Sequence, residues 1–191
     1  MKTLQLLRHI TFGLATVLMA NTAFAQATPA TEKKVLPPNP QSRALLADKP
    51  SPAATATGKI GAADVTIKYS SPAVKGRTIY GGLVPYNQVW RAGANEATTV
   101  EFSKPVKVEG KPLAAGKYSF FAIPTEKQWT IIFNKVPEQW GAFKYAQKDD
   151  ALRVTVTPRK AATMAERLAY EVKPTGMVLR WENLEVPVAI K

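Results

Sequence analysis

The sequence predicts an all-β protein, an antiparallel two-sheet sandwich of jelly-roll-like form that carries long irregular loops. From Thr57 onward, short stretches of the chain alternate apolar and polar residues with a period of two, as half-buried strands do. Turn signals containing Gly, Pro or Asn separate these stretches, and no stretch shows the period of a long helix. No internal repeat of about 20–50 residues is present, which argues against a propeller or a solenoid.

The N-terminus has the three parts of an export signal in order. Lys2 and Arg8 are positive, Ile10–Ala20 is apolar, and Ala23–Ala25 forms a small-x-small cleavage site. The apolar run is shorter than the roughly 20 residues that a spanning helix needs, so we expect no membrane span. Residues 1–25 are predicted to be a cleaved signal peptide, which indicates a periplasmic or secreted protein.

Cleavage of the signal peptide removes a group that many enzymes use. The one histidine, His9, lies within the signal, and the chain has no cysteine. A mature protein without imidazole or thiol cannot have a Ser-His-Asp triad, a Cys-His pair, or His or Cys ligands for zinc, copper or haem. We therefore expect no bound metal and no cofactor, and the sequence favours a protein that is not an enzyme.

The positive charge of the chain is spread along its length. The formal net charge of +12 falls to +10 without Lys2 and Arg8, and a basic protein favours acidic partners such as anionic glycans or lipid headgroups. No basic run is interleaved with aromatic residues, as it is in proteins that track nucleic acid, so no nucleic-acid partner is expected. Most of the lysines are interpreted as solvated surface.

The segment that follows the signal peptide, residues 26–56, is rich in Ala, Pro, Thr, Ser and Lys and has few large apolar groups. Such a segment buries too little surface to offset its ordering entropy, so it is predicted to be a flexible linker. Residues 57–191 are then expected to form a single β-sandwich domain, which is long enough for a sizeable core.

The domain is predicted to contain roughly nine or ten short strands. Gly116–Ile123 is apolar on both faces, which is typical of a central strand covered on two sides, and Pro124 ends it. Trp129 alternates with Ile131 and Phe133 and is placed in the core. The other alternating segments are 65–70, 98–102, 106–108, 152–156, 168–172, 177–181 and 184–190.

Three polar or irregular features lie among these strands. Residues 161–166 are interpreted as one helical turn. Asp149 and Asp150 are interpreted as a solvated turn, because a calcium site needs about six to eight oxygen ligands. Glu182 is expected to pair with Arg180 or Arg153 on a neighbouring strand.

The stretch Ser70–Phe102 does not alternate and is predicted to be a shaped loop that carries a ligand site. Its aromatic residues offer stacking faces, its arginines offer planar forks for an anion, and its Asn and Glu can recognise hydroxyl groups. Trp140 lies beside a glycine in a second irregular region and is a further candidate platform. The candidate ligand-binding residues are Arg77, Tyr80, Tyr86, Trp90, Arg91, Asn95, Glu96 and Trp140. No catalytic residue is assigned.

A structural explanation of the same loop stays open. In this alternative, Arg91 and Glu96 form a local ion pair, Asn95 stabilises a turn through its side chain, and Trp90 and Tyr80 pack under the loop. Satisfied polar networks of this kind help to specify folds without binding any ligand.

Long motifs in the domain resemble an uncharacterised bacterial family, domain-of-unknown-function family 2911. In chain order they are KGRTIYGGLVPYNQVWRAGANEATTVEF, LAAGKYSFFAIP, WTIIFN, QWGAFKY, DDALRV and LRWENLEVPVAI. The resemblance covers about Ser51 to Lys191. Asn87 stands where Gly is expected in the family and Ala114 where Pro is usual, both at turn-like positions. The resemblance implies an exported protein and no established activity.

Three functions are compatible with these residues. The first is a non-enzymatic cell-envelope module that binds a polar ligand such as a glycan. The second is a carbohydrate hydrolase in which two of Glu96, Glu138 and Glu182 face each other about 5–10 Å apart. The third is a structural or protein-interaction domain. The sequence carries no signal for the oligomeric state.

Overall fold

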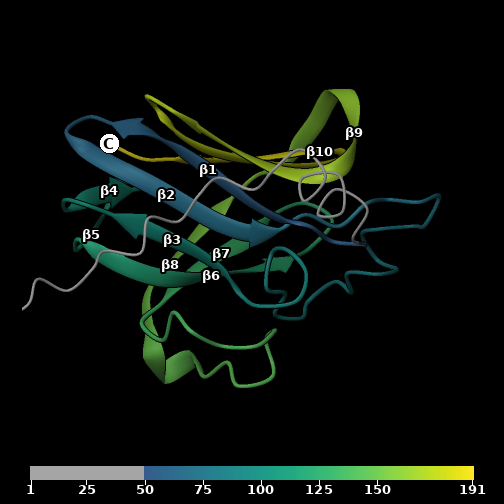
Figure 1. The fold of residues 1–191 in the computed structure, drawn as a ribbon, viewed down its shortest axis with the longest axis horizontal. Coiled ribbons are helices and arrows are strands. Elements are labelled where there is room, and N and C mark those ends of the chain that lie inside the picture. Colours follow the sequence, from purple (N-terminus) through teal and green to yellow (C-terminus); the bar gives the residue numbers. More distant parts are fainter. Residues whose placement is uncertain (1–49) are drawn as a thin grey trace, which may run out of the picture. The chain divides into compact units, whose positions relative to one another are not determined.

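The computed structural model describes residues 50–191, so the predicted signal peptide and residues 26–49 of the predicted linker lie outside the described residues. The described part of the chain consists of strands, loops and one 3-10 turn (Figure 1). The elements are β1 (Ala53–Ile60), β2 (Ala63–Ser70), β3 (Thr98–Phe102), β4 (Val106–Val108), β5 (Lys111–Leu113), β6 (Gly116–Pro124), β7 (Trp129–Asn134), η1 (Gln147–Asp149), β8 (Asp150–Val156), β9 (Arg159–Lys173) and β10 (Gly176–Ala189).

Six of the strands form one antiparallel sheet in the order β1-β2-β3-β6-β7-β8. The order follows the chain except for the β4–β5 hairpin between β3 and β6. The sheet is therefore a meander, without the crossed connections of a jelly roll. β6 lies in its interior, between β3 and β7, as its apolar sequence predicts.

The second layer is built around the long β9–β10 hairpin. At one side of the hairpin, the end of β10 is joined to β4, where Lys107 and Lys191 exchange backbone hydrogen bonds of 2.7 and 3.0 Å. At the other side, Val74 N–H donates to the carbonyl of Glu166 at 2.7 Å in β9. The all-β, antiparallel sandwich predicted from the sequence is confirmed.

The main core lies between the two layers. The inward residues of the larger sheet, such as Ile67, Val100 and Phe133, pack with Leu179 and Trp181 of β10. Trp129 is fully buried here, as its alternation predicts. A smaller apolar cluster lies on the opposite face of the larger sheet, where Phe121 and Ile132 are covered by the loop between β7 and β8.

Two boundaries differ from the sequence prediction. Residues 53–56, assigned to the linker, belong to β1 and pair with β2. Their small residues give no apolar alternation, and Gly58 instead allows close contact, since a Cβ there would lie 2.8 Å from Val172 Cβ. Residues 161–166 are part of β9 and not a helical turn, because β9 pairs with β10 through a bulged register over this length.

Candidate functional site

The candidate residues of the loop between β2 and β3 do not form one surface. Tyr80 and Trp90 are buried, with exposed fractions of 9% and 8%, so little of either ring is free to stack on a ligand. Before the start of β3, Trp90 pairs through its backbone with Ala122 of β6, with hydrogen bonds of 2.8 and 2.9 Å. Ala122 is an inward position of the sheet, so the indole opposite it also points into the core.

Four aromatic residues from distant segments meet at this point. The rings of Trp90 and Trp181 are stacked with centroids 5.9 Å apart, and Tyr80 meets Trp129 edge-on at 5.1 Å. Burial, with a smaller contribution from the charge of Glu182, raises the pKa of Tyr80 well above its usual range. The structural explanation of Tyr80 and Trp90 therefore holds: both pack under the loop.

Glu96 and Trp140 lie together at a groove on the outer face of the larger sheet, which we call the sheet groove. Its volume is about 630 Å³. Thr55, Lys68 and Thr99 are neighbours across β1, β2 and β3 and line its floor. Its other lining residues are Ala53, Ala54, Tyr69, Ser70, Ala97, Lys117, Pro137, Glu138 and Gln139.

The contact between Glu96 and Trp140 is set by the backbone. Ala97 N–H donates to the carbonyl of Gln139 at 3.0 Å, and Gly141 N–H donates to the carbonyl of Asn95 at 3.1 Å. These two bonds flank Glu96 and Trp140, which makes them a non-hydrogen-bonded antiparallel pair with adjacent side chains on one side. Trp140 is 60% exposed, so an indole face and a carboxylate are presented together.

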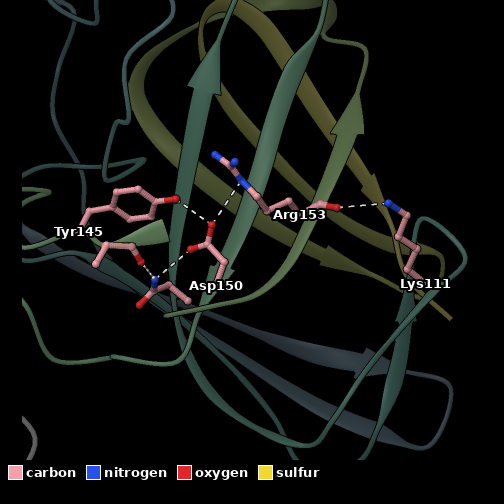
Figure 2. A network of polar contacts seen from close by, with 6 residues as sticks. Lys111, Tyr145, Asp150 and Arg153 are labelled. Atoms are coloured by element: carbon pink, nitrogen blue, oxygen red, sulfur yellow. Dashed lines mark hydrogen bonds and ion pairs between the residues drawn. The ribbon is translucent and has the colours of Figure 1, made fainter. Parts of the chain in front are cut away.

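A buried polar network holds the loop that carries Trp140 (Figure 2). The side chain of Asp150 is 6% exposed and accepts hydrogen bonds from Tyr145 Oη at 2.7 Å and Asn134 Nδ2 at 2.9 Å. Arg153 Nε lies 3.3 Å from the same carboxylate. The prediction of a solvated turn is therefore wrong for Asp150, because its charge is compensated inside the protein.

Tyr145 of this network and Gln139 of the groove wall are both held by side-chain hydrogen bonds. Burial, followed by the hydrogen bond to Asp150 and the charge of Asp150, raises the pKa of Tyr145 to about 12. Gln139, which lies in the groove wall, donates to the carbonyl of Val136 at 2.7 Å and to Ser119 Oγ at 3.2 Å. The wall is thus fixed to β6 by side-chain bonds.

A second hollow, which we call the arginine pocket, has a volume of about 330 Å³. It contains four of the candidate residues: Arg77, Trp90, Arg91 and Asn95. The other lining residues are Ser51, Pro72, Leu83, Val84, Gly93, Ala94 and Trp181. Burial lowers the pKa of Arg91 below its usual range.

The proposed ion pair between Arg91 and Glu96 is absent from the ion pairs of residues 50–191. Arg91 lines the arginine pocket, whereas Glu96 lines the sheet groove. Asn95 lies between them with φ 57°, and its Nδ2 donates to Ser70 Oγ at 3.2 Å and to Ser51 O at 3.4 Å. These bonds join the loop to residues distant in the chain, so the side chain of Asn95 ties the loop to the segments around Ser51 and Ser70 and does not cap a local turn.

Tyr86 and Glu182 line neither the sheet groove nor the arginine pocket. Tyr86 lines a third depression of about 320 Å³ with Asn87 and Lys127. Of the three glutamates considered for hydrolysis, Glu96 and Glu138 both line the sheet groove, whereas Glu182 does not.

The ion pair expected for Glu182 is also not observed in the described part of the chain. Arg180 Nη2 lies 2.6 Å from Glu185 and 3.9 Å from Glu171, while Arg153 faces Asp150. Glu182 sits at a register irregularity of β10 with φ 55°, which removes it from the regular cross-strand positions.

The sequence analysis did not place the polar residues Lys68, Lys117 and Gln139 beside Glu96 and Trp140. Lys68, Lys117 and Gln139 line the groove together with Glu138, although they come from three separate segments. Lys68 occupies an outward position of the alternating β2, and Lys117 lies at the polar start of β6, so only Lys68 was signalled by alternation. Their proximity depends on strand register, which alternation alone does not specify.

Comparison with known protein families identifies the family of this chain. Among residues 50–191 no three potential ligating side chains cluster around a metal position, and no helix has the length and apolarity to cross a bilayer. Comparison with curated proteins and with solved structures found no match. The family model described as "Protein of unknown function (DUF2911)" matches residues 51–190, the whole of the sandwich except its last residue. The chain therefore belongs to this family of proteins of unknown function.

Proposed function

We propose that this protein is a non-enzymatic binding module for a polar ligand such as a glycan, and that the ligand lies in the sheet groove. One observation carries the proposal: Trp140 is 60% exposed and is paired with Glu96 at a groove of about 630 Å³. An exposed indole beside a carboxylate acceptor combines an apolar face with a polar contact, which is the combination that a sugar ring needs.

The chemistry of the groove matches a ligand with many hydroxyl groups. The indole of Trp140 offers an apolar face to the C–H groups of a sugar ring, and Glu96 offers an acceptor for hydroxyl protons. Lys68 and Lys117 offer donors on the groove floor. A few placed polar groups around an apolar surface are typical of small-molecule sites of this volume.

The expected location agrees with this ligand class. A signal peptide over residues 1–25 directs the protein to the periplasm or outside the cell, where envelope polymers present sugars. The basic net charge of the chain favours the acidic members of that group.

Binding to arrays of glycans and envelope polymers tests the proposal. We expect Trp140→Ala and Glu96→Gln each to weaken binding about tenfold or more, because each removes a contact at the centre of the groove. Phe143→Ala is the matched control, since Phe143 is an exposed aromatic residue of the same loop that does not line the groove. Equal binding by wild type and Trp140→Ala would exclude the groove as the site.

The hydrolase alternative has one observation in its favour, because Glu96 and Glu138 both line the groove. The side chain of Glu138 is 85% exposed and lies 3.5 Å from Lys117 Nζ. Catalytic carboxyls usually occupy more desolvated positions, so binding without hydrolysis is favoured. Release of new reducing ends from a bound glycan, lost in Glu138→Gln, would establish hydrolysis instead.

The protein-interaction alternative is supported by other side chains of the same loop. Phe143 is 85% exposed and Val136 is also exposed. If Phe143→Ala, and not Trp140→Ala, abolishes association with the envelope, this surface contacts a protein and the glycan proposal fails.

A further inference from the structure

The arginine pocket carries an excess of positive charge. Arg77 and Arg91 both line it, and none of its lining residues is acidic. The ion pairs among residues 50–191 use other cations: Lys59, Lys117, Arg153, Arg159, Lys173 and Arg180. Arginine keeps its proton in proteins, so two guanidinium charges meet at this hollow without a carboxylate to balance them.

Hydrogen-bond donors at the pocket lack acceptors. Arg91 Nε and Trp181 Nε1 are buried, and neither has a partner among the described residues. A buried donor without an acceptor is destabilising, and an oxygen of a bound anion can supply the missing acceptor. Arg77 directs Nε to the carbonyl of Val74 at 3.0 Å and Nη2 to the carbonyl of Ala73 at 2.5 Å, which fixes its guanidinium and leaves Nη1 for another acceptor.

The remaining walls of the pocket are apolar. Trp90 and Trp181, stacked on each other, form one wall, and Pro72, Leu83 and Val84 contribute aliphatic surface. At about 330 Å³ the hollow is near the lower limit of small-molecule sites. Its composition suits a molecule with an anionic group and a compact apolar body.

The backbone beside Arg91 is strained and firmly held. Ala92 is buried with φ 52°, a left-handed conformation that is unfavourable for a residue with a Cβ. Its carbonyl accepts hydrogen bonds from Tyr170 Oη at 2.7 Å and Thr98 Oγ1 at 3.0 Å. Strain retained at one position in this way is typical of sites where a side chain must be presented in a defined direction.

We infer that the arginine pocket is a second binding site, separate from the sheet groove, for a small organic oxyanion. Arg91 and Arg77 hold the carboxylate or phosphate group by charge-assisted hydrogen bonds, and the apolar body contacts Leu83, which is 48% exposed, and the part of Trp90 that lines the pocket. The segment around Asn95, bonded to Ser51 and Ser70, separates this site from the groove. The inference does not depend on the glycan proposal.

Titration calorimetry with four probes tests the inference. Phenyl phosphate and benzoate carry the two candidate oxyanions on an apolar ring, inorganic phosphate carries the anion alone, and benzyl alcohol is the neutral match. We expect at least one ring-bearing anion to bind about tenfold or more tightly than benzyl alcohol, and to weaken with added salt. Comparison of phenyl phosphate with benzoate identifies the preferred oxyanion.

Variants assign the binding to the pocket. Arg91→Gln and Arg77→Gln should each reduce the affinity for the preferred anion about tenfold or more, and circular dichroism should confirm that both variants are folded. Lys75→Gln removes a nearby exposed cation that does not line the pocket and should bind as wild type does. Trp140→Ala should also leave anion binding unchanged. Equal affinity for phenyl phosphate, benzoate and benzyl alcohol, or equal anion binding by wild type and both arginine variants, would overturn the inference.

Discussion

Whether Trp90 and Trp140 are buried or exposed depends on the residue with which the backbone of each one pairs. Trp90 and Trp140 are both tryptophans of irregular segments, and by sequence either is a candidate platform. Trp90 pairs with Ala122, an inward position, and is buried, whereas Trp140 pairs with Glu96 at the sheet groove and is exposed. An indole side chain therefore belongs to the core at position 90 and to the exposed lining of the sheet groove at position 140.

Substitution of the two tryptophans should separate these roles. Trp90→Ala removes a ring stacked on Trp181 and should cost about 3–5 kcal/mol of unfolding free energy, as other large-to-small core changes do. Trp140→Ala should change stability by no more than about 0.5 kcal/mol, because its side chain is mostly in water. Denaturant unfolding of both variants measures the difference, and similar costs would contradict the burial of Trp90.

Elements position the sheet groove through a loop that has little regular structure of its own. The loop between β7 and β8 covers Phe121 and Ile132 and forms the groove wall. Its end is fixed by the carboxylate of Asp150, which receives bonds from Tyr145 and Asn134 (Figure 2). The orientation of Trp140 thus depends on a polar network below the surface.

Removal of this carboxylate should loosen the groove wall. Asp150→Ala leaves Tyr145 Oη without its acceptor and should cost about 1–3 kcal/mol. The amide of Ala97 donates to the carbonyl of Gln139, and the amide of Gly141 donates to the carbonyl of Asn95. Hydrogen exchange at both amides should become faster than in wild type. Asp149→Ala is the matched control, because the side chain of Asp149 takes no part in the network. Unchanged protection of both amides in Asp150→Ala would show that the wall is held by other contacts.

The whole molecule is stabilised by a core that contains tyrosine hydroxyls as well as hydrocarbon. Tyr170 is buried between the layers, packs edge-on against Tyr69 at 4.8 Å, and donates to the carbonyl of Ala92. Burial raises the pKa of Tyr170 well above its usual range. Because the neutral phenol is favoured in the folded state, stability should depend on alkaline pH.

The direction of this dependence follows from the two states. The unfolded tyrosine ionises near pH 10, so the stabilising contribution of Tyr170 is fully present below about pH 10 and is lost as the pH rises towards its higher folded pKa. Denaturant unfolding at a series of alkaline pH values measures the loss. Tyr170→Phe should be less stable at neutral pH by about 1 kcal/mol, since one hydrogen bond to Ala92 is missing. Its stability should fall less steeply above pH 10, and an equally steep fall would exclude Tyr170 as a source.

The sequence alone was sufficient to predict the all-β class, the interior position of β6 and the burial of Trp129. These properties depend on the order of apolar and polar residues within single strands, which can be read from the sequence without knowledge of the fold. It was also sufficient to place Glu96, Trp140 and the arginines among the candidate residues, because their side-chain chemistry is independent of the fold.

Only the tertiary structure decided which of these residues meet. The candidates of the β2–β3 loop divide between a groove, a pocket and the core, because different parts of this long loop are bonded to different elements of the fold. Trp140 lies in the loop between β7 and β8, and it meets Glu96 only because this loop pairs with the segment that precedes β3. Pairing between segments distant in the chain depends on register and loop path, and neither is encoded in the local period that predicted the strands.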